Sequence, residues 1–191
     1  QADCDLIPRL GFPRTGGLGL DEAGEAFFQF DHAGRGAARG RERAHGGQGL
    51  SATEQLIFFE EANIAGAPLP FVTISTVGPA LMESGSAAQK ARFLPGIASG
   101  ELIFAIGYSE PQAGSDLAVL KTQAKLEGDL QTGRFIVNGS KLWTSGIEAA
   151  DHIWLAARTD PDLPRHKGVS ILILDTNVPG FSHTLIETVG N

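Results

Sequence analysis

The stretch ELIFAIGYSEPQAGSD, Glu101–Asp116, marks the point at which the sequence changes character. Its first half is an apolar run typical of a β-strand, whereas its second half concentrates hydroxyls, carboxylates, glycines and a proline. Gly107 and Gly114 leave room for a close backbone approach, and Pro111 fixes one φ angle. Such a turn suits the wall of a site for a flat or phosphorylated ligand, but a polar turn that satisfies only its own backbone is an equal alternative.

The residues before this stretch, 50–100, predict helices. Ser51 and Glu54 form a capping box, which opens a helix that is expected to end near Gly66. The segment PALMESG predicts a second, short helix, and the box SAAQ opens a third that is expected to break at Pro95. The apolar faces of these helices need partners, so we expect an amino-terminal helical domain.

The residues from Glu101 onward predict strands. The segments TQAKLEGD, HIWLAART and GVSILILD are strand-like, and Asn138-Gly139 lies between two further apolar segments, a pattern typical of a type I′ hairpin. We therefore expect an α+β fold, in which an α-helical domain over 50–100 precedes an antiparallel β-barrel-like domain over 101–191 that is apparently truncated. Residues 1–49 are rich in Gly, Arg and Ala and predict an irregular segment.

The composition narrows the classes of function. A net charge of −7 argues against nucleic acid as the main partner, and the four arginines within Arg35–Arg43 lack the interleaved aromatic residues of an RNA-binding segment. The single cysteine, Cys4, fits a reducing compartment, and no apolar run approaches the about 18 residues of a membrane helix. We expect a cytoplasmic protein with no membrane span. The histidines show no metal-ligand spacing, so no metal site is expected.

A second polar stretch, GSKLWTSG over Gly139–Gly146, carries an aromatic residue among hydroxyls. If this stretch is a strand, Lys141, Trp143 and Ser145 share one face by the period of two. Trp143 would then suit stacking against an aromatic ligand, with the hydroxyl at its rim. A core tryptophan beside a turn serine is the alternative, and taken alone this stretch slightly favours it.

The two stretches together, YSEPQAGSD and about thirty residues later FIVNGSKLWTSG, resemble the acyl-CoA dehydrogenase family. The resemblance runs from about Gly46 to Asn191. The helical half is similar to that family's amino-terminal domain, and GVSILILDTNVPGFS to a strand of its middle β domain. The resemblance implies FAD as the cofactor and acyl-CoA as the substrate. Members that act on bulky or steroid-side-chain acyl-CoAs are the most similar.

The resemblance also implies roles for single residues. The first stretch would line the isoalloxazine ring and pyrophosphate of FAD, with the Ser109 hydroxyl toward the ring. Ser115 would lie between the FAD phosphates and the acyl-CoA, and so also bind substrate. Tyr108 stands where the family usually has a smaller aliphatic residue, which leaves the shape of the pocket beside the flavin open. Thr144 also stands where an aliphatic residue is usual, which leaves open whether Thr144 or Ser145 meets the flavin. The implied cofactor-binding residues are Ile106, Gly107, Tyr108, Ser109, Gly114, Ser115, Trp143, Thr144 and Ser145.

The implied reaction is oxidation of an acyl-CoA to the 2,3-enoyl-CoA. A glutamate removes the α-proton, and the β-hydrogen leaves as hydride to the flavin. That glutamate normally belongs to a carboxy-terminal helical domain, and this chain begins with Gln and ends inside the middle domain. We therefore expect a fragment that is inactive alone, and we name no catalytic residue in it. A shifted reading frame upstream of the match would account for the dissimilar residues 1–45.

The expected partners are an electron-transfer flavoprotein or a similar acceptor, within a homo- or hetero-oligomer. The main alternative is a non-catalytic subunit that contributes FAD- or CoA-binding surface to a heteromeric flavoenzyme. Another flavin chemistry on the same scaffold, an oxidase or an N-hydroxylase, is a second alternative, and preference between oxygen and other electron acceptors would separate it. An RNA-binding protein ranks last.

Overall fold

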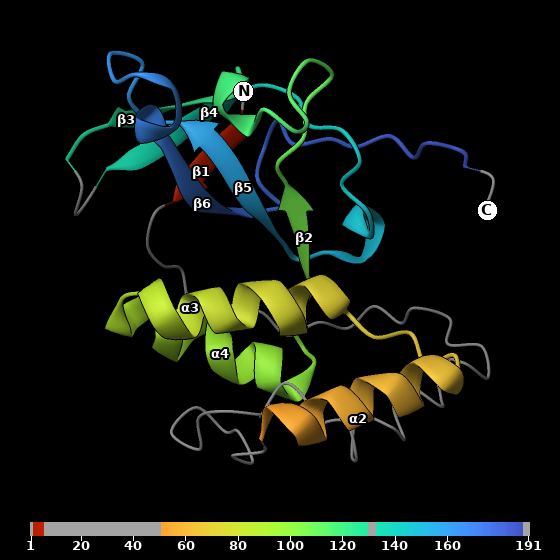
Figure 1. Ribbon diagram of the computed structural model, residues 1–191. Helices are drawn as coiled ribbons and strands as arrows, with labels where there is room; N and C mark the ends of the chain where they lie inside the picture. Colours follow the sequence, from red (N-terminus) through yellow and green to blue (C-terminus); the bar gives the residue numbers. More distant parts are fainter. Residues whose placement is uncertain (1, 6–50, 130–132, 189–191) are drawn as a thin grey trace. The chain divides into compact units, whose positions relative to one another are not determined.

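The computed structural model describes residues 2–5, 51–129 and 133–188. The chain divides after Ile103 into two compact units, a helical unit before this point and a sheet unit that follows it and includes the first strand. The predicted order, helices first and a sheet second, is confirmed (Figure 1). No helix within the described ranges is long and apolar enough to cross a membrane.

The helical unit begins with α2 (Ala52–Ile64), and both predicted capping boxes are present. The Ser51 N–H donates to Glu54 Oε2 at 2.7 Å, and the Glu54 N–H donates to Ser51 Oγ at 3.3 Å. The second box, at Ser86, repeats this exchange with Gln89 at 2.9 and 3.2 Å. Each box satisfies N–H groups that the first helical turn leaves without an intrahelical partner.

The third helix is α4 (Ala87–Ser99). It continues through Pro95 to a left-handed cap at Gly100 (φ 79°), so the prediction that it breaks at Pro95 is wrong. A proline inside a helix removes one hydrogen bond at a cost of about 3 kcal/mol. Buried side chains on both sides of Pro95 outweigh this cost by anchoring the helix: Phe93, Leu94, Ile97 and Ala98.

The short helix predicted at PALMESG is α3 (Gly78–Ser84), and a π-helical segment that the sequence analysis did not predict, η2 (Thr73–Val77), leads directly into it. At Gly78 the helices α3 and α4 lie side by side, since a Cβ there would be in van der Waals contact with Ile97 Cγ2 at 3.6 Å. Val77 and Leu81 are fully buried, so they supply the core of this unit.

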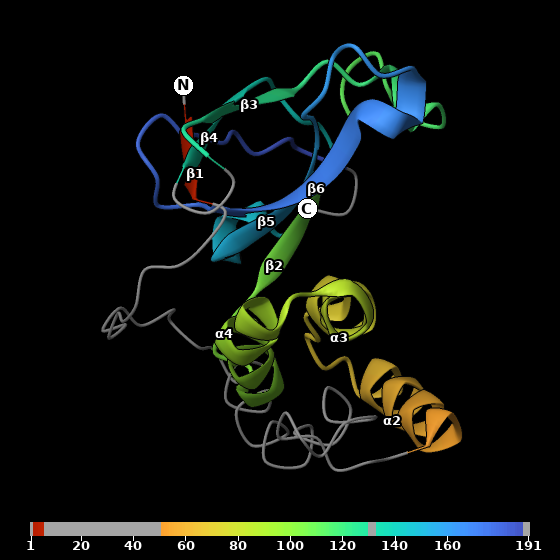
Figure 2. The ribbon, with the colours of Figure 1, turned by 90° about the vertical axis from the view of Figure 1, so that its left-hand side faces the viewer.

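The sheet unit is built around β5 (His152–Arg158), which pairs antiparallel with β6 (Val169–Asp175) along its whole length (Figures 1 and 2). The other edge of β5 pairs with β2 (Phe104–Gly107) and, at Arg158, with β3 (Gln123–Glu127). Both of these pairings are parallel, so the sheet is mixed and the expectation of a purely antiparallel sheet is corrected there. The described strand order is β1-β4-β3-β5-β2, with β6 on β5.

The prediction of a hairpin at Asn138-Gly139 is wrong. Residues 128–133 connect β3 to its antiparallel partner β4 (Arg134–Asn138), and the chain after Asn138 leaves the sheet. Gly139 has a φ of 158°, and a Cβ built there would lie 2.7 Å from Thr122 Cα. The glycine therefore serves a close approach to the segment before β3, a long-range contact that the dipeptide alone does not reveal.

The first strand, β1 (Ala2–Asp5), pairs antiparallel with β4. The prediction of an irregular segment over 1–49 is therefore wrong for these four residues, because their backbone pairs with the strand β4. The rest of that expectation, the arginine run included, lies outside the described residues.

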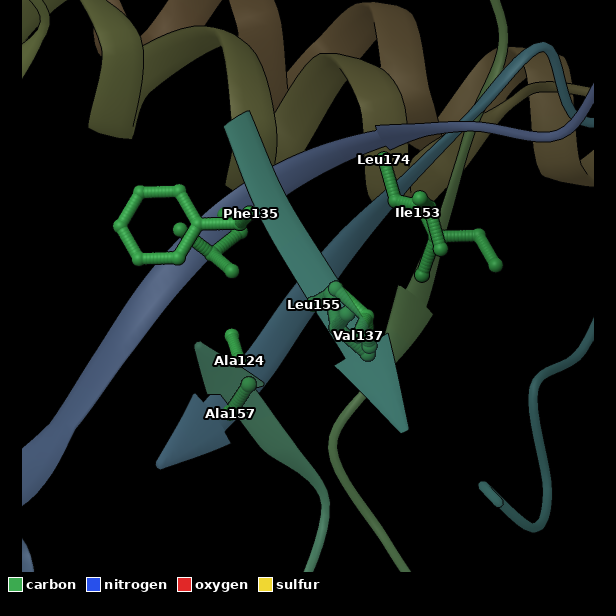
Figure 3. Packing of buried hydrophobic residues seen from close by; sticks show 8 residues of the cluster. Ala124, Phe135, Val137, Ile153, Leu155, Ala157 and Leu174 are labelled. Atoms are coloured by element: carbon green, nitrogen blue, oxygen red, sulfur yellow. The ribbon is translucent and has the colours of Figure 1, made fainter. Parts of the chain in front are cut away.

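The core of the sheet unit consists of alternate residues of β3, β4, β5 and β6, whose side chains converge on one side of the curved sheet (Figure 3). Its buried members are Ala124, Phe135, Val137, Ile153, Leu155, Ala157, Leu172 and Leu174. Along each strand the core takes every second residue, because successive side chains of a strand point to opposite faces of the sheet. Short 3-10 turns occupy the connections: η3 (Leu117–Val119), η4 (Ile147–Ala149) and η5 (Arg165–Gly168).

Candidate functional site

The polar loop after β2 folds into a closed turn. The Glu110 N–H donates to the Ala113 carbonyl at 2.8 Å, and the Ala113 N–H donates back to the Glu110 carbonyl at 3.0 Å. Pro111 and Gln112 form the exposed tip between them. Ala113 is buried against Leu120, so the turn is fixed to the sheet unit at its base.

The Glu110 side chain is the most heavily bonded group in this loop, and only 2% of it is exposed. One carboxylate oxygen accepts from Gln112 Nε2 at 2.6 Å and from the Lys121 N–H at 2.7 Å. The other accepts from the Thr122 N–H at 3.0 Å and from Lys141 Nζ at 2.7 Å. A buried carboxylate with donors on both oxygens is held in its charged form.

The ion pair between Glu110 and Lys141 joins the two polar stretches, which lie 31 positions apart in the sequence. Only 10% of the Lys141 side chain is exposed, and its Nζ also donates to the Tyr108 carbonyl at 3.1 Å. Burial would raise the pKa of Glu110, but the hydrogen bonds from Lys141, Thr122 and Lys121 outweigh it and lower that pKa to about 2. Burial lowers the pKa of Lys141, against the opposite effect of the Glu110 carboxylate.

The second polar stretch is not a strand, so the prediction that Lys141, Trp143 and Ser145 share a strand face is wrong. The Leu142 N–H donates to the Ser109 carbonyl at 2.9 Å, and this bond fixes the stretch beside the first loop. Lys141 points inward to Glu110, whereas Trp143 is 63% exposed. Trp143 has a φ of 61°, and this left-handed conformation is rare for a bulky residue.

Tyr108 is half-buried and packs against the small cluster of Ala113, Leu120 and Ala156. Its hydroxyl oxygen accepts a hydrogen bond from Trp154 Nε1 at 3.1 Å, which ties the loop to β5. The larger side chain at this position therefore has a partner for its hydroxyl, as a partly buried tyrosine requires.

The two glycines singled out in the sequence differ in their surroundings. A Cβ at Gly107 would lie 2.8 Å from Ile153 Cγ2 and 3.1 Å from Leu155 Cδ1, and so would clash with β5. A Cβ at Gly114 would meet nothing within 4 Å. Gly107 is thus required by the internal packing, whereas Gly114 faces open space.

The predicted site residues fall into two groups. Gly107, Tyr108 and Ser109 lie at the junction with the second stretch, and Ile106 and Thr144 are half-buried beside it in the sequence. The others, Gly114, Ser115, Trp143 and Ser145, are exposed.

The far end of the loop leads to an exposed ion pair, in which Asp116 Oδ2 accepts from Arg165 Nη2 at 2.9 Å. Arg158 connects the same regions by donating to the carbonyls of Ala118 at 2.8 Å and Arg165 at 3.0 Å. These bonds hold the segment after Ser115 against the turn at η5. In the described part of the chain no group of three or more His, Cys, Asp or Glu side chains is placed to hold a metal ion.

The residue that the sequence analysis missed is Glu110. A signal for it was present, because the first of the two stretches implied to line the cofactor carries two acids, Glu110 and Asp116, and the second carries one base, Lys141. Burial decides that Glu110, and not Asp116, takes Lys141 as its partner, and burial is not visible in the sequence.

Two family models match the chain, the acyl-CoA dehydrogenase N-terminal domain over residues 40–101 and the acyl-CoA dehydrogenase middle domain over residues 105–191. Acyl-CoA dehydrogenase FadE26 from Mycobacterium tuberculosis is 52% identical over 155 residues. The match covers 80% of this chain and 38% of that protein.

Two solved structures resemble the chain closely. The Tcur3481–Tcur3483 steroid ACAD matches with a TM-score of 0.80 and 50% identity, over 87% of this chain and 42% of that chain. The ChsE4–ChsE5 complex from Mycobacterium tuberculosis matches with a TM-score of 0.78 and 49% identity, over 86% and 42%. The chain spans less than half the length of these relatives. The two domain matches and these relatives show that the chain belongs to the acyl-CoA dehydrogenase family.

Proposed function

We propose that this chain is the FAD-binding part of an acyl-CoA dehydrogenase that oxidises an acyl-CoA to the 2,3-enoyl-CoA. The observation that carries the proposal is the junction of the two polar stretches. The Ser109 carbonyl accepts from the Leu142 N–H at 2.9 Å, and the next residue is the exposed Trp143. Family membership supports an oxidoreductase, and this junction supplies a surface suited to a flavin.

The residues at the junction fit FAD. Trp143 offers an exposed aromatic face, and exposed aromatic groups next to hydroxyls suit a planar heteroaromatic ring with polar edges. Ser109, Thr144 and Ser145 would supply hydroxyls near that ring. The open space over Gly114 would admit the pyrophosphate close to the backbone, with Ser115 between FAD and the acyl-CoA. Ile106, Gly107 and Tyr108 would form the part of the junction that supports these cofactor-binding groups.

When bound, FAD would supply the acceptor for a hydride from the β-carbon of an acyl-CoA whose α-proton a base removes. This chain's residues would bind and orient both molecules so that the reacting carbons face the flavin. Glu110 is not that base, because it is buried and its pKa of about 2 makes it a poor proton acceptor. The base belongs to sequence outside this chain, whose relatives are more than twice as long.

The proposed substrate is a bulky acyl-CoA. The solved relative that matches with a TM-score of 0.80 is a steroid ACAD, which supports an acyl group that carries fused rings. The proposed electron acceptor is an electron-transfer flavoprotein or a similar protein, and the proposed location is the cytoplasm.

The full-length protein, purified from its native cells, tests this function. We expect a flavin absorption band that bleaches when a steroid-side-chain acyl-CoA is added without oxygen, and a mass at least twice the 20.1 kDa of this chain. Trp143→Ala should weaken FAD retention, whereas Arg134→Gln, which breaks an exposed ion pair with Glu127, should not. A native protein of about 20.1 kDa that carries no flavin would contradict the proposal.

A second candidate is a non-catalytic subunit that lends FAD- or CoA-binding surface to a heteromeric flavoenzyme. The match to the ChsE4–ChsE5 complex favours it, because that structure contains two kinds of subunit. Purification under native conditions separates the candidates. A flavin that bleaches with acyl-CoA only after a second polypeptide is added would support the subunit, and bleaching by the single polypeptide would support the enzyme.

A further inference from the structure

The backbone of Trp143 is held in a conformation that it would not adopt freely. Its φ of 61° lies in the left-handed region, which is energetically costly for a bulky residue. Because Trp143 is 63% exposed, burial of the indole offsets little of that cost. The restraint must therefore come from the neighbouring residues.

Two bonds on the residues directly before Trp143 provide this restraint. The Leu142 N–H donates to the Ser109 carbonyl at 2.9 Å, and Lys141 Nζ donates to Glu110 Oε1 at 2.7 Å. On the other side, the Ser145 N–H donates to the Trp143 carbonyl at 3.0 Å and tightens the turn. The exposed indole is thus the tip of a short segment whose base is fixed by a buried charge pair.

The ion pair has a property that an apolar contact would lack. A buried ion pair seldom stabilises a fold more than apolar side chains of the same volume, but its directional bonds specify one geometry. Glu110 accepts hydrogen bonds from three segments of the chain. The donors are Gln112 in its own turn, Lys121 and Thr122 before β3, and Lys141 before Trp143. One carboxylate therefore sets the positions of both polar stretches at once.

We propose that Glu110 and Lys141 are positioning residues for the cofactor, whose buried ion pair holds Trp143 and the hydroxyls beside it in the arrangement that receives the flavin ring. This inference rests on the proposed FAD site, and it adds a positioning role for two residues outside that site. Neither side chain needs to touch the cofactor, because Lys141 acts through the backbone of Leu142 and Trp143.

The test compares FAD binding with stability in the full-length protein. Lys141→Met keeps the apolar stem and removes the charge. Trp154→Phe is introduced into the parent and every variant, and any tryptophan outside this chain is likewise replaced by phenylalanine. Trp143 is then the only tryptophan fluorophore, because this chain has only two tryptophans. FAD titrations that follow Trp143 fluorescence should show at least about tenfold weaker binding for Lys141→Met, and acrylamide quenching of the apoprotein should change. Arg134→Gln, at an exposed ion pair, should change neither.

Two conservative variants keep the proposal testable if Lys141→Met does not fold. Glu110→Asp and Lys141→Arg retain both charges but shift the paired atoms. Positioning predicts that each weakens FAD binding and alters Trp143 quenching, although the protein stays folded. If these variants, or a folded Lys141→Met, lose stability but bind FAD with the affinity of the parent, the pair is merely structural and the proposal is overturned.

The quenching measurement also separates this inference from the proposed function. If the parent protein binds no FAD, the proposed function fails. Trp143 quenching that is unchanged in Lys141→Met would then overturn the positioning of Trp143 as well. A change in quenching would support it independently of any cofactor.

Discussion

The two halves of the candidate site are built in opposite ways. The anchored half, which consists of Gly107, Tyr108, Glu110 and Lys141, is buried or half-buried and bonded to β5, to the segment before β3 and within itself. The open half, which consists of Gly114, Ser115, Trp143 and Ser145, is exposed. Along each of the two stretches the anchored residues come first and the open residues follow, so residues a few positions apart serve opposite needs.

The stability of the site therefore resides mainly in the anchored half, and its binding capacity in the open half. Substitutions in the anchored half remove bonds that exist without a ligand, so they should lower the free energy of unfolding. Substitutions in the open half remove groups with few internal contacts, so their effect should appear only when a ligand binds. The following substitutions test this division, from the largest expected effect on stability to the smallest.

Glu110→Ala should have the largest effect. It leaves the buried Lys141 ammonium without its carboxylate and the Lys121 and Thr122 N–H groups without their acceptor. Removing one partner of a buried pair costs about 3–5 kcal/mol. Urea unfolding of the purified protein measures this loss. The control is Glu127→Ala, at an exposed ion pair, which should cost less than about 1 kcal/mol. Equal losses of stability at both positions would contradict the claim that the anchored half stabilises the protein.

The second-largest loss of stability should come from acid, which protonates the carboxylate of the anchored half. The fold lowers the pKa of Glu110 from 4.5 to about 2, since hydrogen bonds outweigh the opposing effect of burial. The unfolded chain therefore takes up this proton first, and stability is lost as the pH falls from about 4.5 toward 2. The shift corresponds to about 3 kcal/mol.

The measurement is unfolding at several pH values for the wild type and Glu110→Gln. The difference in stability between the two proteins should shrink across this acidic window, because the variant carries no proton-binding carboxylate there. A difference that stays constant from neutral pH down to about 2 would show that the carboxylate titrates normally.

Gly107→Ala should destabilise the protein by about 1–3 kcal/mol, the usual cost of overpacking. The new methyl group would lie 2.8 Å from Ile153 Cγ2, and Ile153 belongs to the main core. Thermal unfolding measures the change. An unaffected melting temperature would mean that β2 and β5 separate easily at this position, which would contradict the tight pairing of Gly107 with Leu155.

The sequence predicted the local parts of the fold well. Both capping boxes are exchanges between residues three positions apart, so Ser51 with Glu54 and Ser86 with Gln89 could be paired by spacing alone. The failures depend on distant contacts. The helix passes through Pro95 because buried neighbours anchor both sides, and Gly139 serves the approach to Thr122 instead of a hairpin.

The candidate site divides in the same way. That the two polar stretches meet was implied by the resemblance, and the Ser109–Leu142 hydrogen bond is consistent with it. The inward turn of Lys141 and the outward turn of Trp143 could not be predicted, because the prediction assumed a strand with a period of two. The left-handed φ of Trp143 breaks that period, and it follows from bonds that span about thirty residues of sequence.

Gly114→Ala should have the smallest effect on stability and the most informative one on binding. The added methyl group meets nothing within 4 Å, so the free energy of unfolding should change by no more than about 1 kcal/mol. If the FAD pyrophosphate passes close to this backbone, the same methyl group should weaken FAD binding in a titration. The same substitution at Gly107 would then lower stability, while at Gly114 it would lower affinity. A loss of stability at Gly114 that equals the loss at Gly107 would remove the distinction between the halves. Unchanged stability together with unchanged FAD affinity would keep the distinction but exclude Gly114 from the cofactor site.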